Sequence, residues 1–191
     1  EINGQPSTIF RPFDWVLYKG AGSITSISEG YTFSYIATKH GGVKRFNLFG
    51  NYFEEPITTA QGLKSNSISA LHFDKQTGLL WVATDKYIHY SFSREGDWFF
   101  FNLNSIGLSY RDRIESIGSS KHYVWLKARS TYIKLEHSSG TLVGIFPTPD
   151  ELNINWSSGE YEGEPILKEL FLEYSIMEGW TFVGDELIDM L

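Results

Sequence analysis

Ile24-Thr25-Ser26-Ile27 is a short tetrad of apolar and hydroxyl residues that returns twice along this chain. It recurs 44 residues later as Ile68-Ser69-Ala70-Leu71, and a further 46 residues on as Ile114-Glu115-Ser116-Ile117. An aromatic residue inside an apolar run follows each copy, at Tyr35, Trp81 and Trp125. A period in the forties built from short strands is typical of β-propeller blades.

Each repeat predicts four strands, because alternating apolar runs are separated by residues that favour turns. The tetrad is the first strand, and the aromatic run is the second. The expected strands are 24–27, 35–38, 43–46 and 53–58 in the first copy, 68–71, 81–84, 88–90 and 98–103 in the second, and 114–117, 125–128, 133–135 and 142–146 in the third. Turn chemistry is clear at Asp74 to Gly78 and at Ser138-Ser139-Gly140.

The predicted fold class is therefore all-β, a β-propeller of about three complete four-stranded blades with partial blades at both ends. Residues 1–191 form a single propeller domain or a propeller fragment. The expected parts are blades at about 19–58, 63–103 and 109–146, an irregular insertion at about 147–165 and a partial blade at about 166–191.

The two ends of the chain leave the blade number open. Asp14-Trp15-Val16-Leu17-Tyr18 looks like a fourth strand without its blade, and Ser175–Phe182 repeats Ser26–Phe33 at six of eight positions. These pieces either close a four-bladed ring or belong to a larger propeller whose other blades lie elsewhere. The larger propeller is favoured, because four-bladed rings are the rarer arrangement and an open terminal blade needs a partner.

Composition excludes several classes of protein. The chain has no Cys, so it contains neither a disulfide framework nor a thiolate metal site. No run approaches the 18 apolar residues that a membrane-spanning helix needs. The formal net charge of −7 disfavours nucleic acid as a partner, because phosphates are repelled. The sequence begins with Glu1 rather than Met, so any targeting segment is out of view.

The second copy resembles a known repeat. Gly62 to Asp74, continued by Gly78-Leu79-Leu80-Trp81-Val82-Ala83-Thr84, is similar to the two-component-regulator propeller repeat. The first copy has Tyr35 in place of the Trp, and the third keeps Trp125 but loses the glycine turn. Such repeats occur in sensor regions of bacterial hybrid histidine kinases and in a propeller component of type IX secretion. The resemblance implies an extracytoplasmic location, in the periplasm or at the cell surface.

Motifs for catalysis are missing from the sequence. It contains no Gly-x-Ser-x-Gly elbow, phosphate loop or dinucleotide fingerprint. The five histidines form no pair with metal-ligand spacing. We therefore expect no enzyme activity, no metal site and no cofactor.

Basic residues gather in one set of connections. In a propeller, the links from fourth to first strand and from second to third strand share one face. The candidate binding residues there are Lys19, His40, Lys64, Lys86, Arg111, Arg113 and Arg129, against Asp85 and Asp112. Trp156, in the irregular insertion, is a further candidate contact. Focused positive charge on an acidic chain indicates an anionic ligand or partner.

The predicted function is a non-catalytic scaffold or recognition module. It would bind a protein partner, including missing blades of the same propeller, or an acidic polysaccharide through this loop face. The alternative is the sensory ligand-binding region of a bacterial signalling protein.

Overall fold

The computed structural model describes residues 21–92, 97–109 and 111–157, with the backbone of β14 (Ser175–Met177) and β15 (Thr181–Val183). The fold is all-β, as predicted, with three antiparallel sheets of four or five strands and two short 3-10 helices. The described strands do not close into a barrel. No described helix has the length and apolar character to cross a bilayer.

The three sheets follow one another along the chain. Sheet 1 contains β1 (Ile24–Glu29), β2 (Phe33–Thr38), β3 (Val43–Asn47) and β4 (Tyr52–Ile57). Sheet 2 contains β5 (Ile68–Phe73), β6 (Leu80–Thr84), β7 (Tyr87–Ser91) and β8 (Phe99–Asn102). Sheet 3 contains β9 (Ser116–Ser119), β10 (Tyr123–Ala128), β11 (Thr131–Glu136), β12 (Leu142–Phe146) and β13 (Asn155–Trp156). The 3-10 helices η1 (Thr59–Gln61) and η2 (Leu103–Ile106) follow β4 and β8.

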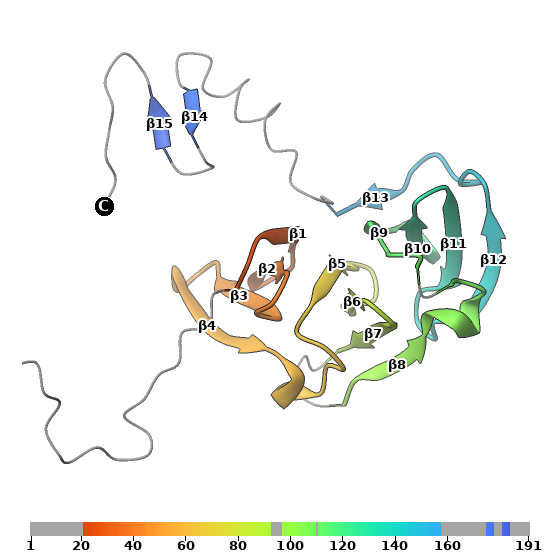
Figure 1. Cartoon of the computed structure of the whole chain (residues 1–191), viewed down its shortest axis with the longest axis horizontal. Coiled ribbons are helices and arrows are strands. Elements are labelled where there is room, and N and C mark those ends of the chain that lie inside the picture. Colours follow the sequence, from red (N-terminus) through yellow and green to blue (C-terminus); the bar gives the residue numbers. More distant parts are fainter. Residues whose placement is uncertain (1–20, 93–96, 110, 158–174, 178–180, 184–191) are drawn as a thin grey trace, which may run out of the picture.

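The sheets lie side by side with their first strands at the centre. Figure 1 shows β1, β5 and β9 close together, with β4, β8 and β12 toward the outside. Two core clusters fill the spaces between the sheets. Tyr35 packs with Leu71 and Val82 between sheets 1 and 2, and Trp81 packs with Ile117 and Leu126 between sheets 2 and 3. Burial of these apolar faces is what holds the sheets together.

Hydroxyl side chains join the first two inner strands. Thr25 Oγ1 donates to the carbonyl oxygen of Ile68 (2.8 Å), and Ser26 Oγ donates to that of Leu71 (3.2 Å). Ser28 Oγ accepts from the backbone N–H of Phe73 (2.9 Å). Thr25 and Ser26 of the tetrad therefore supply donors, and Ser28 supplies an acceptor, for the free edge of β5, because β5 pairs with β6 alone in its own sheet.

Sheet 3 differs from the expected four strands. β13 pairs antiparallel with β9, which gives this sheet a fifth strand within the segment predicted to be an irregular insertion. Pairing is possible because Gly118 leaves room: a Cβ there would lie 2.9 Å from the carbonyl oxygen of Asn155. We call residues 147–157 the strap, since they lead from β12 back to the inner strand β9.

The chain ends give a partial test of the predicted fourth blade. The orphan strand at Asp14–Tyr18 lies outside the described residues. In the β14–β15 hairpin Ile176 pairs with Phe182, whereas the matching Ile27 of β1 pairs with Ile36. The two similar octapeptides therefore pair in different registers, although three residues separate the two strands in each hairpin.

Candidate functional site

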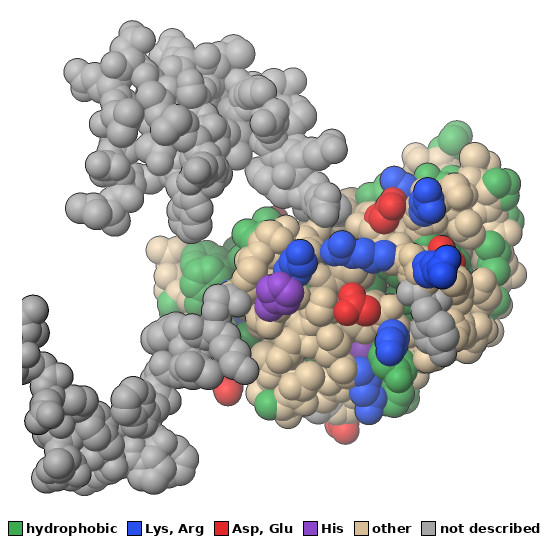
Figure 2. Space-filling view, viewed as in Figure 1, with side chains coloured by type: hydrophobic (Ala, Val, Ile, Leu, Met, Phe, Trp, Pro, Cys, Tyr) green, Lys and Arg blue, Asp and Glu red, His purple; other side chains and the backbone are tan. Residues whose placement is uncertain are grey.

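The predicted basic residues lie at one edge of the three sheets. Antiparallel pairing places the β2–β3, β6–β7 and β10–β11 turns at the same edge as the links that lead into β5 and β9. We call it the basic edge. Its candidate residues, all exposed, are His40, Lys64, Lys86, Arg111, Arg113 and Arg129. In Figure 2 Lys and Arg side chains gather over this side of the sheets, with few carboxylates among them.

Two other candidates lie elsewhere. Lys19 is outside the described residues. Trp156 is in β13, where its ring is 6.1 Å from the ring of Tyr132 in an edge-on arrangement. The structure therefore places Trp156 on sheet 3, beside Tyr132 near the start of β11.

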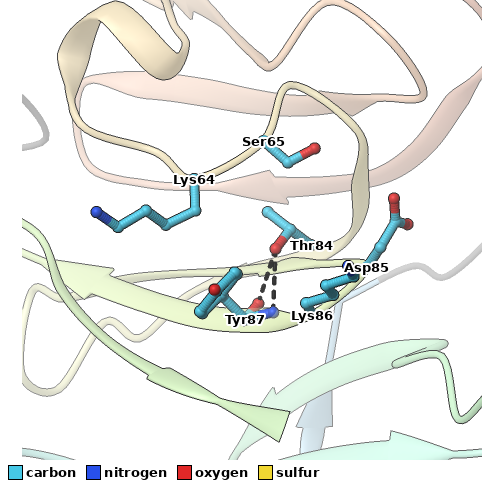
Figure 3. Close-up of a pocket in the computed structure, with 6 residues that line it drawn as sticks. All are labelled: Lys64, Ser65, Thr84, Asp85, Lys86 and Tyr87. Atoms are coloured by element: carbon cyan, nitrogen blue, oxygen red, sulfur yellow. Dashed lines mark hydrogen bonds between the residues drawn. The ribbon is translucent and has the colours of Figure 1, made fainter. Parts of the chain in front are cut away.

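A pocket of about 220 Å³ opens at the basic edge of sheet 2 (Figure 3). Lys64 and Ser65, from the link into β5, face the β6–β7 turn. The lining residues are Lys64, Ser65, Thr84, Asp85, Lys86 and Tyr87. Thr84 Oγ1 accepts from Tyr87 N–H (3.2 Å) and donates to the Tyr87 carbonyl (3.1 Å), which fixes the tight turn that presents Lys86.

Lys64 is held at both its backbone and its side chain. Its N–H donates to Nε2 of His89 (3.1 Å), and its ammonium lies 4.3 Å from the centroid of the Phe100 ring. Burial lowers the pKa of His89 to about 4, with a smaller lowering from the Lys64 charge and an opposing hydrogen bond with Val82. His89 is therefore neutral at pH 7, so Nε2 is available as an acceptor.

The link before Lys64 is ordered by local hydrogen bonds. Thr58 caps η1, since its Oγ1 accepts from Ala60 N–H while Gln61 Oε1 accepts from Thr58 N–H. Gly62 ends η1 in the left-handed region at φ 105°, which glycine adopts without strain. Asn66 then receives hydrogen bonds from Thr59 N–H and Gly42 N–H. The Lys64 backbone is thus fixed before any ligand arrives.

Carboxylates reduce the positive charge of the basic edge but do not cancel it. Asp112 accepts from Ser109 N–H (2.8 Å) within its own turn. Glu115 lies 3.7 Å from the ammonium of Lys127 and so offsets a cation outside the candidate set. Asp85 is the acidic residue of the pocket, against Lys64 and Lys86. The arrangement can attract and hold an anion by charge.

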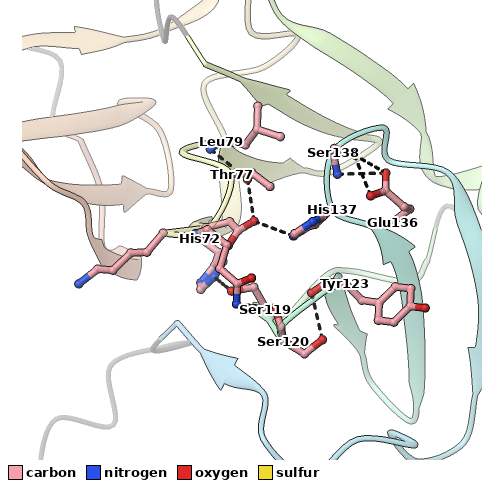
Figure 4. A network of polar contacts seen from close by, with 12 residues as sticks. His72, Thr77, Leu79, Ser119, Ser120, Tyr123, Glu136, His137 and Ser138 are labelled. Atoms are coloured by element: carbon pink, nitrogen blue, oxygen red, sulfur yellow. Dashed lines mark hydrogen bonds and ion pairs between the residues drawn. The ribbon is translucent and has the colours of Figure 1, made fainter.

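The opposite edge carries turns that join the sheets (Figure 4). His72 Nδ1 lies 2.6 Å from Ser157 Oγ, and Nε2 lies 2.8 Å from Ser119 Oγ. Asp74 accepts from Thr77 Oγ1 (2.6 Å) and lies 3.3 Å from His137 Nδ1. His72, Asp74, Ser119 and Ser157 are all buried. Sequence analysis missed these contacts, because the partners of His72 are 47 and 85 residues away and share no spacing pattern.

These buried serines and His72 form no nucleophile site. A Ser–His pair acts on a substrate only where the hydroxyl can reach it, and a carboxylate usually orients the second ring nitrogen. Here both ring nitrogens of His72 contact serine hydroxyls, and burial lowers its pKa to about 4. Within the described ranges, no three His, Asp or Glu side chains come together as a metal site would need.

Comparison with known proteins gives a fold likeness. No protein-family model and no curated protein matches this chain. Two structures of the extracellular domain of BT4673 from B. thetaiotaomicron are similar, each at 15% identity. One, named as a one-component system, has a TM-score of 0.53 over 80% of this chain and 18% of its own. The other, named as a hybrid two-component system, has a TM-score of 0.52 over 72% and 17%.

The chain therefore spans less than a fifth of the length of these neighbours. At this identity the likeness concerns the fold alone. This chain shares its all-β fold with part of the extracellular domain of a two-component system.

Proposed function

We propose that this chain is a section of a β-propeller that serves as a non-catalytic recognition module in the extracytoplasmic, sensory part of a bacterial signalling protein. Its ligand is anionic and binds at the basic edge. The supporting observation is the presence of exposed Lys and Arg side chains at one edge of successive sheets, where two of them, Lys64 and Lys86, line a pocket.

The propeller interpretation rests on the repeated way in which the sheets meet. Tyr35, Trp81 and Trp125 each lie in the second strand of their sheet. They pair across to the third strand with Arg45, Tyr90 and Lys134, respectively. The first strands lie together at the centre, and successive sheets are joined by a link from an outer strand to the next inner strand (Figure 1). This arrangement is typical of propeller blades.

The recognition role rests on charge placed away from the core. The whole chain carries a formal net charge of −7, so most of its surface should repel anions. The basic edge is the local exception, because its grouped cations attract anions. Because His89 and Phe100 already hold Lys64 in place, less conformational entropy is lost at this residue when a ligand binds.

The sensory setting is supported by the names of the structural neighbours, which are extracellular domains of a one- or two-component system. The scaffold role expected from the sequence remains a prediction. A transmembrane helix and a kinase or regulator domain encoded downstream in the parent gene would support sensing, whereas a secretion-sorting tail there would support the scaffold.

The experiment compares the wild-type chain with Lys64→Ala/Arg111→Ala/Arg113→Ala. Sulfated and uronate oligosaccharides are the probes, and a neutral oligosaccharide of equal length is the control ligand. Exposed ion pairs contribute ~0.2–1 kcal/mol each, so the triple variant should lose roughly 3- to 100-fold in affinity. Glu54→Ala/Glu55→Ala/Asp97→Ala, which removes charge elsewhere, should leave the affinity unchanged or slightly higher.

Binding that is unaltered in the basic triple variant, or equal for neutral and anionic probes, would remove the proposed ligand class. Raising the salt concentration should weaken wild-type binding in parallel, because exposed charges are screened.

A further inference from the structure

One carboxylate among the cations of the basic edge lines the pocket. Asp85 and Lys86 form the turn between β6 and β7. In the other two sheets the residue that follows the second strand is basic and exposed, namely Lys39 after β2 and Arg129 after β10. Asp85 therefore reverses the charge at a repeated position, and it does so at the turn that borders the pocket.

The pocket has a basic end and an acidic end. Figure 3 shows the Lys64 ammonium and the Asp85 carboxylate on opposite sides, with the Tyr87 ring between them. Lys86 adds a second cation to the lining. The Lys64 ammonium lies on the Phe100 ring, and no described carboxylate forms an ion pair with it. Its charge is therefore available to a ligand.

The Asp85 carboxylate makes few contacts within the described part of the protein. Its Oδ1 is 3.5 Å from Ser67 Oγ, which is long for a hydrogen bond between hydroxyl and carboxylate. Neither Lys64 nor Lys86 forms an ion pair with it. A carboxylate has about four lone-pair sites, so the exposed Asp85 side chain can accept further donors from a ligand.

The backbone that carries Asp85 is fixed. Thr84 Oγ1 closes the turn through its two hydrogen bonds with the Tyr87 backbone. The Lys86 carbonyl accepts from the N–H of Leu103 in η2 (2.9 Å), which fastens the turn to the outer part of the molecule. The turn therefore presents Asp85 at a defined position before a ligand binds.

A carboxylate in a pocket for anions affects which anions bind. It lowers the affinity for a purely anionic ligand, because like charges repel. This cost is offset when the ligand itself brings a cation to the carboxylate, so the residue separates two kinds of anionic ligand. The pocket volume of about 220 Å³ is below the ~300–1,000 Å³ of pockets that enclose drug-sized ligands, so one small unit of a longer ligand enters it.

We propose that the ligand is amphoteric: its anionic groups face Lys64 and the rest of the basic edge, and an ammonium group of the same ligand binds Asp85. This inference rests on the proposed function, since it names which anionic ligands the basic edge accepts. Asp85 favours ligands with a protonated amine beside their anionic groups and disfavours ligands with anionic groups alone.

Two probes that differ only in their amino groups test the role of Asp85. One is a sulfated glucosamine oligosaccharide with free amino groups. The other is its N-acetylated form, which has the same length and the same sulfate groups but no ammonium. At about pH 6 amines of this kind are protonated. Calorimetric titration of the full chain should show roughly 3- to 10-fold tighter binding of the free-amine form, although its net negative charge is lower.

Variants separate Asp85 from the rest of the basic edge. Asp85→Ala and Asp85→Asn should each reverse the preference, because the N-acetylated form has the larger negative charge and the cations then decide the affinity. Glu115→Ala is the matched control, since it removes an exposed carboxylate from the link into β9 at the same edge. It should raise both affinities and keep the preference for the free-amine form. Lys64→Ala should weaken both probes.

The outcomes distinguish this inference from the proposed function. Weaker binding of both probes by Lys64→Ala, together with a preference that Asp85→Asn leaves intact, would show that Asp85 is not the ammonium site, and the proposed function would stand. The same conclusion follows if the wild type binds the two probes equally. Unchanged affinities in Lys64→Ala would instead remove the proposed function as well. A wild type that binds neither probe overturns this inference, while the uronate probes still decide the proposed function.

Discussion

The two edges of the three sheets are built from the same kind of turn but use it differently. At the basic edge, turn residues such as Lys86 and Arg129 present exposed charge. At the opposite edge, Gln76 of sheet 2 donates to the Ser120 carbonyl of sheet 3, and Tyr90 donates to that of Ser139. The opposite edge therefore contributes to stability, which leaves the basic edge available for recognition.

The largest effect is expected for Asp74→Ala at the opposite edge. Asp74 is fully buried, and its carboxylate accepts from Thr77 Oγ1 and Gln76 N–H beside His137. Removing the buried carboxylate takes the acceptor from Thr77, Gln76 and His137 at once, which should lower the free energy of unfolding by about 3–4 kcal/mol. Urea denaturation measures this loss. Asp85→Ala, the exposed control at the basic edge, should change stability by less than about 0.5 kcal/mol; a similar loss for both would erase the distinction between the edges.

The next effect is a loss of stability at acidic pH, and it comes from two buried histidines. Burial lowers the pKa of both His72 and His89 to about 4, below the 6.5 of an exposed histidine. Between these values the unfolded chain binds more protons, so stability is level above pH 6.5 and decreases as the pH falls toward 4. Together they should lower the free energy of unfolding by about 2–4 kcal/mol from pH 7 to pH 5.

His72→Gln and His89→Gln, followed by urea denaturation at both pH values, should each remove about half of this dependence. A wild-type protein that is equally stable at pH 5 and pH 7 would show that these side chains are more hydrated than the fold implies.

Much of the fold could be predicted because the repeat carries it. Strands in all three copies lie close to their expected residues, as at Val43–Asn47 and Leu142–Phe146. The third inner strand begins at Ser116 rather than at Ile114, which is buried just before it. β13 was not predicted, since a two-residue strand has no alternation of its own and its pairing depends on the space above Gly118.

The candidate site was predictable only where chain topology decides it. The turns that present Lys64, Lys86 and Arg129 follow from counting antiparallel strands, so their shared edge could be expected. The anchoring of Lys64 by His89 could not, because it depends on which face of β7 meets sheet 1. The pairing of Lys134 with Asp150 and Glu151 was equally hidden, since it requires the strap to turn back over sheet 3.

A smaller loss of stability is expected at the centre of the molecule, where β1 and β5 are joined by a hydroxyl group. Ser28→Ala leaves the buried N–H of Phe73 without its acceptor and should cost about 1–2 kcal/mol in urea denaturation. Ser23→Ala, at an exposed position just before β1, is the matched control and should be neutral. Equal stability of the two variants would mean that the hydroxyls of β1 are dispensable for joining sheets 1 and 2.

The separation of the two edges is tested most directly by measuring the urea midpoint and the anionic-oligosaccharide affinity of two variants side by side. Lys64→Ala/Arg111→Ala/Arg113→Ala should keep the wild-type urea midpoint, with a free energy of unfolding within ~0.5 kcal/mol of the wild type, and lose affinity for the oligosaccharide. His72→Gln should lose stability and keep its affinity at 25 °C and pH 7, where it is still folded. The opposite pattern, in which the basic triple variant unfolds early or the His72 variant loses the ligand, would contradict the account.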